Sequence, residues 1–469
     1  MTDLDLVALD ATAQATMIRA RQISARELTD ATLRRIDELD PAFNAFRVVM
    51  AEEALAEADT IDALSDADLA TLPMAGVPVA IKDDTDVAGQ RTAWGCAADR
   101  GSCARDSEVV RRIRGSGATI IGKTNVSELT LWPWTASQPW GVTRNPWNVD
   151  RTPGGSSGGS AAAVCTGMAA VALGSDGGGS VRYPAGLTGL VGVKPQRDRI
   201  PVGPEHASAW HGLLVLGPLT RSVRDAALFL DVAAPDDGDS TFRDALTRSP
   251  RRLRIAVSTN PPPGTQASLS STGRRAVDEA VAVLADHGHE IVDVDVDIDY
   301  GLGSLWSSTV RLLKGAQDDV AAMQDRSCLE ARTLSVARLG RWLPSRSLRR
   351  ALAREQRIGE SINAVFDAAD VVLTPLCGSP APRVDDCPTR GALRSLRASN
   401  TSAWLAPWNV IGQPAVAVPI GIDGDNVPTA IQLACQARDE PTLLALAGQI
   451  ETARPFPRWD RATMVGSDA

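Results

Sequence analysis

The stretch at residues 152–180 constrains the fold of this chain more than any other. It reads T-P-G-G-S-S-G-G-S-A-A-A-V-C-T-G-M-A-A-V-A-L-G-S-D-G-G-G-S. Two glycine-serine loops, 154–160 and 175–180, flank a run of small apolar residues that predicts a tightly packed, buried helix. Glycine has no Cβ, so the backbone N–H groups of such loops can approach a ligand closely. Together the loops can supply a hydroxyl nucleophile and the amides that stabilise an oxyanion.

Glycine-serine stretches also occur as flexible linkers and as plain turns. The apolar run between these two loops favours a folded core, because linkers lack hydrophobic periodicity. With 469 residues the chain can bury a large core. We find neither an internal repeat nor a low-complexity linker long enough to divide it. One domain over residues 1–469 is therefore expected.

Helix and strand patterns alternate along the chain. Residues 1–70 show mostly helical spacing, with one helix expected to begin at Ser24. From residue 72 the pattern changes to a short buried strand at 77–81, which ends at Lys82. The other predicted elements are helices at 107–115, 272–287, 302–365 and 443–454, a helix capped by Ser222, and strands at 118–121, 253–257, 291–298, 371–374, 415–418 and 430–433. This alternation predicts an α/β fold.

The charge balance limits the partners of this chain. Its net charge of −9 disfavours nucleic acid or an anionic membrane as the main partner. The first residues, MTDLDLVALD, are acidic and have no apolar signal core, and no apolar run reaches the length of a membrane span. We therefore expect no nucleic acid and no membrane as partner, and a cytoplasmic location.

The residues that usually bind metals are few and scattered. The seven cysteines contain no C-x-x-C pair, so they support neither a disulfide framework nor a zinc site. There are only four histidines. The alternating Asp293, Asp295 and Asp297 could suggest calcium, but a solvated strand face is the favoured interpretation. We expect no metal.

Lysine is rare in this chain, which gives each lysine more weight. Of 48 basic residues only four are lysine, namely Lys82, Lys123, Lys194 and Lys314. Arginine stays protonated in proteins, whereas a buried lysine can lose its proton and act as a base. A lysine at the end of an apolar strand, such as Lys82, is also typical of a surface residue whose stem covers apolar atoms.

Two familiar motifs occur in the wrong context. G-A-T-I-I-G-K-T at 117–124 matches the phosphate-binding loop, but a helix is predicted before its first glycine and a strand lies inside it. G-G-S-S-G matches the nucleophile elbow of serine hydrolases, but a loop rather than a buried strand precedes it. No later aspartate and histidine stand out as partners for that serine. Both motifs are therefore interpreted as coincidental.

Three spaced motifs taken together resemble the amidase signature family. They are G-V-P-V-A-I-K-D around Lys82, G-G-S-S-G-G-S around Ser156 and S-D-G-G-G-S-V-R around Ser180. Further matches are G-K-T-N-V-S-E-L, R-N-P-W-N, G-L-V-G-V-K-P, V-V-L-T-P and W-N-V-I-G-Q-P-A-V-A-V-P. The chain looks most like stand-alone bacterial amidases of the actinobacterial kind. The resemblance covers nearly all of it and implies one α/β/α domain with a central mixed β-sheet, preceded by the helical segment 1–70, with the catalytic core at 72–200.

The resemblance implies a Ser-cisSer-Lys triad. Lys82 would be a neutral, buried base that hydrogen-bonds Ser156, and Ser156 would relay a proton from the nucleophile Ser180. The peptide bond between Gly155 and Ser156 would be cis. Ser157, Asp176 and Arg182 would support the site. The oxyanion hole would consist of the backbone N–H groups of Gly177, Gly178, Gly179 and Ser180.

The implied reaction is amide hydrolysis through an acyl-enzyme. Ser180 would attack the carbonyl, the amine would leave and water would release the acid, without metal or cofactor; esters and carbamates could react as side substrates. Two alternatives stay open: the glutaminase subunit of a tRNA-dependent amidotransferase, and a non-catalytic binding protein on the same fold. A homodimer also stays open.

Several features bear on the substrate, which we expect to be apolar or aryl. The family's usual T-D-T-G-G-S reads S-D-G-G-G-S here, so Gly177 is expected to leave the pocket slightly roomier and to admit bulky acyl groups. Trp132 and Trp134 could line the pocket or only pack beneath a loop. The helical stretch 302–365 lies where family members vary and could form a lid over the pocket.

Overall fold

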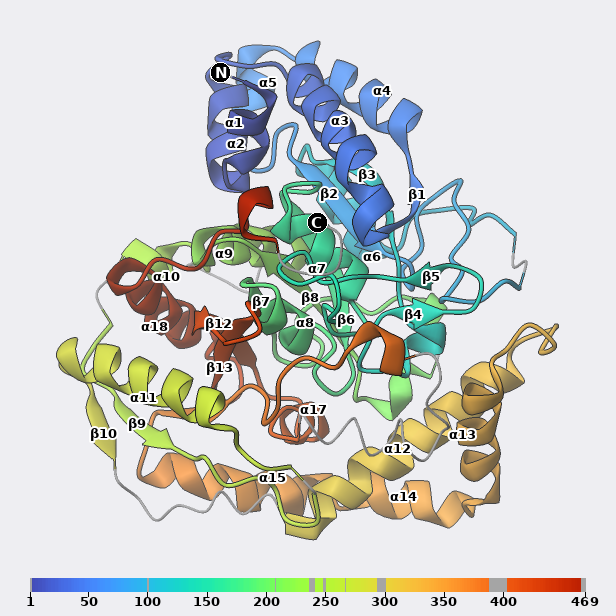
Figure 1. Ribbon diagram of the computed structural model, residues 1–469, viewed down its shortest axis with the longest axis vertical. Helices are drawn as coiled ribbons and strands as arrows, with labels where there is room; N and C mark the ends of the chain where they lie inside the picture. Colours follow the sequence, from blue (N-terminus) through green and yellow to red (C-terminus); the bar gives the residue numbers. More distant parts are fainter. Residues whose placement is uncertain are drawn as a thin grey trace.

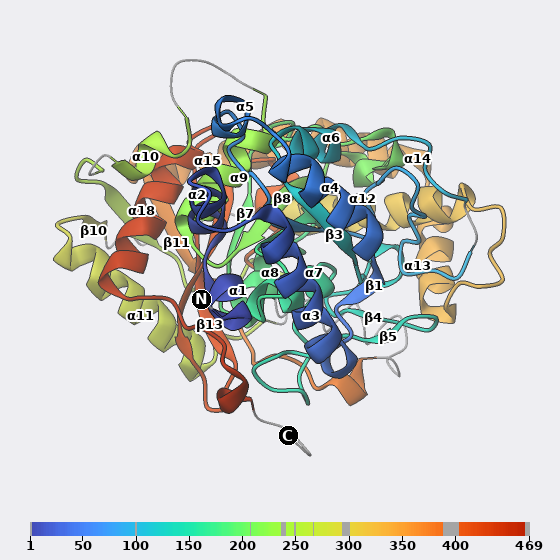
Figure 2. The same ribbon diagram turned by 90° about the horizontal axis from the view of Figure 1, so that it is seen from above.

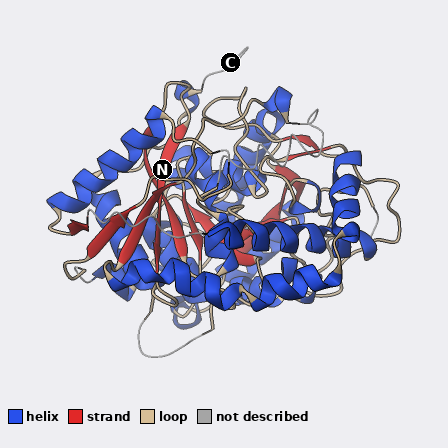
Figure 3. Cartoon of the chain, turned by 90° about the horizontal axis from the view of Figure 1, so that it is seen from below, coloured by secondary structure: helices blue, strands red, loops and turns tan. Residues whose placement is uncertain are grey.

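The computed structural model describes residues 2–98, 101–206, 208–235, 241–247, 250–265, 267–292, 301–387 and 403–464. They form one mixed β-sheet with helices packed on both faces (Figures 1 and 3). The alternating aspartates Asp293, Asp295 and Asp297 lie outside the described residues. The described residues include no group of three histidine, cysteine or carboxylate side chains that could hold a metal ion. No helix among them is both long and apolar enough to cross a membrane.

The central sheet has eleven strands in the order β1-β3-β2-β6-β8-β7-β12-β13-β11-β9-β10. The pairs β3–β2, β2–β6, β11–β9 and β9–β10 are parallel, and the other six pairs are antiparallel. The strands are β1 Phe46–Val49, β2 Pro78–Lys82, β3 Thr119–Thr124, β6 Val171–Asp176, β7 Val191–Lys194, β8 Val215–Thr220, β9 Arg254–Val257, β10 Glu290–Val292, β11 Val371–Pro375, β12 Ala415–Ile422 and β13 Pro428–Cys435. A separate two-stranded sheet pairs β4 Ala136–Ser137 with β5 Gly141–Val142. The prediction of an α/β fold with a central mixed sheet is confirmed.

Two groups of consecutive helices, far apart in the sequence, lie at different places in the molecule (Figures 1 and 2). Figure 1 shows α1–α5 at one end of the molecule and α12–α15 at the other. The first group is α1 Asp3–Ala8, α2 Ala11–Arg19, α3 Ala25–Phe43, α4 Ala51–Asp62 and α5 Asp66–Ala70. The second group is α12 Gly301–Ala321, α13 Ala331–Trp342, α14 Ser345–Ala353 and α15 Glu355–Asn363. The others are α6 Glu108–Gly115, α7 Gly158–Cys165, α8 Arg182–Leu187, α9 Val223–Ala233, α10 Asp244–Thr247, α11 Ser271–Asp286, α17 Ala406–Val410 and α18 Glu440–Ala453.

The parallel pairing of β2 with β6 determines where the site lies. Ile81 pairs with Leu173 in that register, so the carboxyl ends of both strands meet at one edge of the sheet. β2 ends at Lys82, and β6 ends in Ser175 and Asp176. Residues about ninety positions apart in sequence are thereby brought side by side.

The small apolar run between the two glycine-serine loops differs from the single helix expected. It forms α7 and then the strand β6. Gly167, with φ of +78°, follows the last turn of the helix, because glycine adopts this left-handed conformation without a Cβ clash. All eight residues of α7 are buried, as the sequence predicted. A Cβ on Gly159 would lie 2.6 Å from the backbone of Asn125, so only glycine allows this packing.

The N-terminal helices also differ in their boundaries. The helical spacing before Ser24 forms two helices, α1 and α2, which are divided at Asp10, whose side chain caps α2. Ser65 similarly begins a separate α5. Residues 46–49 form the edge strand β1, which the helical pattern of 1–70 did not predict. The predicted caps Ser24 and Ser222 are confirmed, since each accepts a backbone N–H three residues later.

Candidate active site

Lys82 is completely buried at the carboxyl end of β2. Its Nζ lies 2.7 Å from Ser156 Oγ, 2.7 Å from Ser175 Oγ and 3.2 Å from the Ser175 carbonyl oxygen. The alternative of a surface lysine is therefore wrong. The lysine and one of the two candidate serines are in direct contact.

Ser175 and Asp84 belong to the surroundings of Lys82, although the sequence did not single out either one. Ser175 Oγ donates a 2.5 Å hydrogen bond to Asp84 Oδ2, and the same carboxylate oxygen lies 3.5 Å from Lys82 Nζ. All three side chains are buried. The parallel β2–β6 pairing was the signal that could have found them, because Asp84 and Ser175 lie at the ends of these two strands.

Burial lowers the pKa of the Lys82 ammonium, while the carboxylate of Asp84 opposes this shift in part. For Asp84, burial raises the pKa, but the charges of Lys82 and His206 outweigh it and the net pKa is lowered. This lowering depends mainly on a charged Lys82, and the hydrogen bonds from Ser175 and Thr85 also favour the Asp84 carboxylate. His206 is buried on this side of the site, and no histidine is found among the described residues that line the cavity beside Ser180.

The loop that carries Ser156 has the backbone that the resemblance implies. The Gly155–Ser156 peptide bond is cis. A Cβ on Gly155 would lie 2.6 Å from the backbone nitrogen of Trp134, so a larger residue does not fit there. Thr135 Oγ1 donates to the Gly154 carbonyl oxygen at 3.1 Å. The loop therefore packs directly against the segment that contains the two tryptophans.

Ser180 is half-buried, whereas Ser156 is completely buried. The backbone N–H of Ser157 donates to the Ser180 carbonyl oxygen at 3.3 Å, which holds the two loops together. Although both serines are among the described residues, no hydrogen bond joins their hydroxyl groups. The structure thus forms the contact between Lys82 and Ser156 but not the hydrogen bond expected between Ser156 and Ser180.

The glycine loop before Ser180 differs in one respect from the expected oxyanion hole. The amide of Gly179 donates to Asp176 Oδ1 at 2.6 Å, so this N–H is already engaged. The amides of Gly177, Gly178 and Ser180 remain as candidate donors. Gly178 is open to the cavity, since a Cβ built there would meet no atom within 4 Å.

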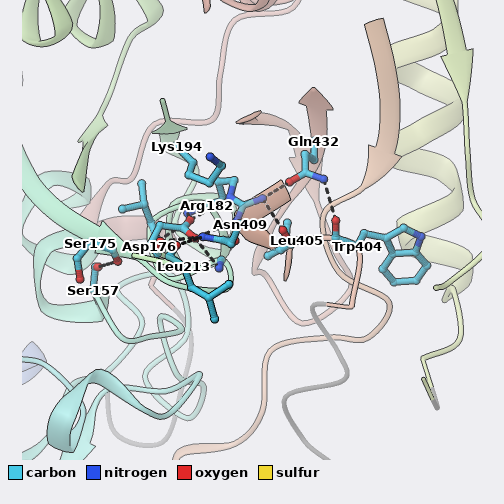
Figure 4. Close-up of polar contacts among 12 residues, drawn as sticks. Ser157, Ser175, Asp176, Arg182, Lys194, Leu213, Trp404, Leu405, Asn409 and Gln432 are labelled. Carbon is cyan, nitrogen blue, oxygen red and sulfur yellow. Dashed lines mark hydrogen bonds and ion pairs between the residues drawn. The ribbon is translucent and has the colours of Figure 1, made fainter. Parts of the chain in front are cut away.

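Asp176 and Arg182 form a buried ion pair beneath this loop (Figure 4). Arg182 Nε and Nη2 donate to the two carboxylate oxygens of Asp176, both at 2.9 Å. The backbone N–H groups of Val181 and Arg182 also donate to Asp176. Burial alone would raise the pKa of Asp176, but the charge of Arg182 outweighs it and keeps the pKa well below its usual range.

Further contacts of this pair come from the C-terminal third of the chain, and the sequence did not assign them. Arg182 donates to Gln432 Oε1 and Asn409 Oδ1, each at 2.6 Å, and to the Leu405 carbonyl oxygen at 3.0 Å. Asn409 in turn donates to Asp176 Oδ1 at 2.9 Å. Its place in the motif W-N-V-I-G-Q-P was the available signal.

Lys194 lies behind Arg182 (Figure 4). It is completely buried, and burial, together with the charge of Arg182, lowers the pKa of its ammonium to about 7. Its Nζ donates to the Pro195 carbonyl oxygen at 2.9 Å. Lys194 is thus a second buried lysine with a lowered pKa, and among the described residues no hydrogen bond joins it to Ser156 or Ser180.

Ser180 opens into a cavity of about 250 Å³. Trp132 lines the cavity, whereas Trp134 is fully buried behind it and is absent from the lining. Six residues of α12 form another wall, so the predicted helical stretch borders the pocket through this helix. The other described lining residues are also apolar or uncharged, among them Leu131, Pro133, Tyr183, Trp210, Leu213, Pro262 and Pro407.

The expectation of extra room at Gly177 is wrong. A Cβ on Gly177 would lie only 2.7 Å from Cε3 of Trp210. The indole ring already fills the space that the missing side chain would leave.

Trp132 and Trp134 stack with their ring centroids 6.0 Å apart. The guanidinium of Arg332, on α13, lies 4.9 Å from the Trp132 ring centroid. Of the two tryptophans, Trp132 lines the cavity, whereas Trp134 packs in the interior.

Nearby, both carboxylate oxygens of Glu128 accept the backbone N–H of Glu330. Burial raises the pKa of Glu128 to about 7.

The family model described as Amidase matches residues 27–444. The chain belongs to the amidase family.

Two curated relatives and one solved structure show how far the likeness extends. The chain is 45% identical over 458 residues to the protein named "Putative amidase AmiB2" of Mycobacterium tuberculosis, covering 97% of this chain and 98% of the relative. It is 33% identical to a glutamyl-tRNA(Gln) amidotransferase subunit of a Synechococcus strain, covering 93% and 94%. The structure of 6-aminohexanoate cyclic dimer hydrolase with substrate superposes with a TM-score of 0.87 at 29% identity, covering 96% and 98%.

This amidase is a hydrolase that acts on amide C–N bonds. Its substrates are small amides, which suits a cavity of about 250 Å³.

Proposed function

We propose that this amidase hydrolyses a small apolar or aryl carboxylic acid amide through an acyl-enzyme on Ser180. Lys82 is the base and Ser156 the relay. The observation that carries this proposal is the contact of 2.7 Å between Lys82 Nζ and Ser156 Oγ at a completely buried lysine.

The partners of Lys82 are compatible with a neutral amine in the working state as well as with an ammonium, whose third N–H would go to Ser156 Oγ. Ser175 Oγ donates its proton to Asp84 Oδ2, so it accepts a hydrogen bond from Lys82. The Ser175 carbonyl oxygen can only accept as well. Two N–H bonds of a neutral amine are thereby used, and the lone pair is left to face Ser156 Oγ. A neutral Lys82 can therefore take the proton of the Ser156 hydroxyl.

The proton then has to pass from Ser180 to Ser156. Catalytic hydrogen bonds of a free enzyme are often long and tighten when substrate binds. A hydroxyl can donate and accept at once, so Ser156 can give its proton to Lys82 while it takes that of Ser180. Collapse of the tetrahedral intermediate returns the proton along the same route to the leaving amine, and water then releases the acid.

The negative charge on the carbonyl oxygen would be stabilised by the backbone amides of Gly177, Gly178 and Ser180. One such donor is worth roughly 3 kcal/mol in the transition state. The Gly179 amide has a different role, because it ties the loop to Asp176. The ion pair of Asp176 with Arg182 keeps the loop in place before substrate arrives, and Ser157 joins it to the neighbouring loop.

The cavity favours an apolar or aryl substrate. Trp132 and the leucines of α12 provide apolar walls, and no described lining residue carries a charge. Esters and carbamates form the same kind of tetrahedral intermediate, so we expect side activity on both.

The amidotransferase relative makes glutamine hydrolysis the second candidate. Free glutamine carries an ammonium and a carboxylate, and burying them without charged partners is costly. The described cavity wall offers no such partner, which favours the stand-alone amidase.

The test is a substrate screen with purified protein, comparing aryl amides, short aliphatic amides, carbamates and glutamine. We expect turnover of aryl amides by the wild type, and its loss by at least about 10³-fold in Ser180→Ala and in Lys82→Met. Circular dichroism should show that both variants stay folded. Turnover of glutamine alone, or full activity in folded Ser180→Ala, would overturn the proposal.

A further inference from the structure

Trp210 packs against the glycine loop that precedes Ser180. Its ring carbons Cε3 and Cζ3 would lie 2.7 Å and 2.9 Å from a Cβ placed on Gly177. Trp210 also lines the cavity that contains Ser180, and it is 5% exposed. The indole is therefore a wall of the pocket directly beside the expected position of the substrate carbonyl.

Contacts with α12 hold this indole in place. Its Nε1–H donates to Asp319 Oδ2 at 3.1 Å, and Ser208 Oγ donates to the other oxygen of the same carboxylate at 3.0 Å. Gly315, one turn earlier on α12, lets Trp210 approach the helix closely, since a Cβ there would be 2.7 Å from Trp210 Cδ1. The ring is thus enclosed between two glycines, one on the helix and one on the catalytic loop.

The backbone around Trp210 is also held by α12. Ala209, Trp210 and His211 all have φ between +38° and +54°, a region that residues with side chains seldom adopt. Arg311 donates to the His211 carbonyl oxygen, with Nε at 2.9 Å. His211 Nε2 lies 3.1 Å from Asp318 Oδ2. A conformation that the chain would not adopt alone is therefore maintained by α12.

We propose that Trp210 is a specificity-determining residue, whose indole limits the size of the substrate group next to the glycine loop. α12 positions it through Asp319 and Gly315. This inference rests on the proposed acyl transfer at Ser180. It also implies that Gly177 and Trp210 form a complementary pair, in which a small residue at 177 is required by the large one at 210.

The test uses Trp210→Leu, Gly177→Ala and the double variant. Two substrate series are compared by kcat/KM. The first consists of p-nitrophenyl esters and p-nitroanilides of increasing acyl size, and the second of esters and amides of one fixed acid with increasing alcohol or amine size. Trp210→Leu should change the ratio between large and small members of one series by at least about 10-fold. Gly177→Ala should lower kcat/KM by at least about 10-fold, because its new methyl group meets the ring. The double variant should recover most of that loss.

Gly178→Ala is the matched control, because it adds the same methyl group to the same loop where no atom lies within 4 Å. If Gly178→Ala lowers kcat/KM, adding Trp210→Leu should not restore the lost activity. The role of α12 is tested with Asp319. Asp319→Leu removes the acceptor and should move the substrate ranking in the same direction as Trp210→Leu, whereas Asp319→Asn keeps an acceptor oxygen and should leave the ranking nearly as in the wild type.

The outcomes separate this inference from the proposed function. If the wild type hydrolyses the substrates and Ser180→Ala does not, but Trp210→Leu leaves both rankings unchanged or fails to relieve Gly177→Ala, the inference is overturned and acyl transfer stands. Should Trp210→Leu fail to fold, Trp210→Phe, which retains an aromatic ring but lacks the Nε1–H, replaces it and must show the same relief. A wild type without any turnover would overturn the proposed function itself.

Discussion

Arg182→Met breaks the buried ion pair beneath the nucleophile loop while keeping a side chain of similar length. Arg182 and Asp176 are both 0% exposed, and two hydrogen bonds of 2.9 Å join them. Removing one partner of such a pair leaves an uncompensated charge in the interior, at a cost of about 3–5 kcal/mol. Because Asp176 also holds the amide of Gly179, we expect kcat/KM for an amide to fall at least about 100-fold as well.

The assay is urea unfolding at neutral pH, followed by circular dichroism, for the wild type and for two variants. Arg26→Met is the matched control: its ion pair with Asp59 is shorter still, at 2.6 Å, but the side chains are 44% and 54% exposed. Exposed pairs contribute little to stability. Arg182→Met should therefore lower the free energy of unfolding far more than Arg26→Met. Equal losses in the two variants would refute the reasoning.

The pH dependence gives a second check of the same pair. In the wild type the pKa of Asp176 is lowered by Arg182, so the stability that this carboxylate contributes is present above its unfolded pKa and is lost as the pH falls. In Arg182→Met the largest opposing influence is lost, while Asn409 and the backbone amides still donate to the carboxylate. We expect burial to raise the pKa of Asp176 there, so the variant gains stability from protonation on acidification. The difference in stability between the two proteins should narrow from pH 7 towards pH 4. A constant difference would contradict this explanation.

Two other predictions concern titrating groups. The Asp84 carboxylate opposes the lowering of the Lys82 pKa, so Asp84→Asn should lower the pKa of Lys82 further. The ascending limb of the pH profile of kcat/KM should then move to lower pH. A shift to higher pH would contradict the neutral lysine base. Glu128 has a pKa of about 7 in the folded protein, which is above its unfolded value. The free energy of unfolding should therefore fall as the pH rises from about 4.5 to 7, because Glu128 ionises more easily in the unfolded chain. The loss is about 1.4 kcal/mol for each pH unit between the two pKa values. Glu128→Gln should therefore be more stable than the wild type at pH 8 in urea unfolding, but not at pH 4, and an equal gain at both values would argue against it.

The sequence predicted the fold class because hydrophobic spacing is a local property. The strands and helices at 107–124 and after residue 370 could be read from apolar runs, and the starts of two other helices from the capping residues Ser24 and Ser222. The division of the small apolar run into α7 and β6 could not be read in this way. A short run of small apolar residues cannot be assigned to a buried helix or a buried strand by periodicity alone, and the pairing with β2 decides between them.

The residues of the candidate site that belong to recognised motifs could be predicted from the sequence. The residues that reach the site through contacts between distant segments could not. The Lys82–Ser156 contact joins two of the recognised motifs. Ser175 and Asp84 depend on strand register, and the contact of Gly177 with Trp210 depends on how a distant loop folds back onto α12. The homodimer, the cytoplasmic location and the division of the domain stay predictions.

The central claim is that Ser180 carries the acyl group during turnover. The most direct measurement is acid quenching of the enzyme during the first turnovers of an aryl ester, followed by intact mass spectrometry and peptide mapping. The account predicts a mass increase equal to one acyl group, located on Ser180 and absent from Ser180→Ala. An acyl group found on Ser156 instead, or rapid turnover with no labelled serine, would contradict it.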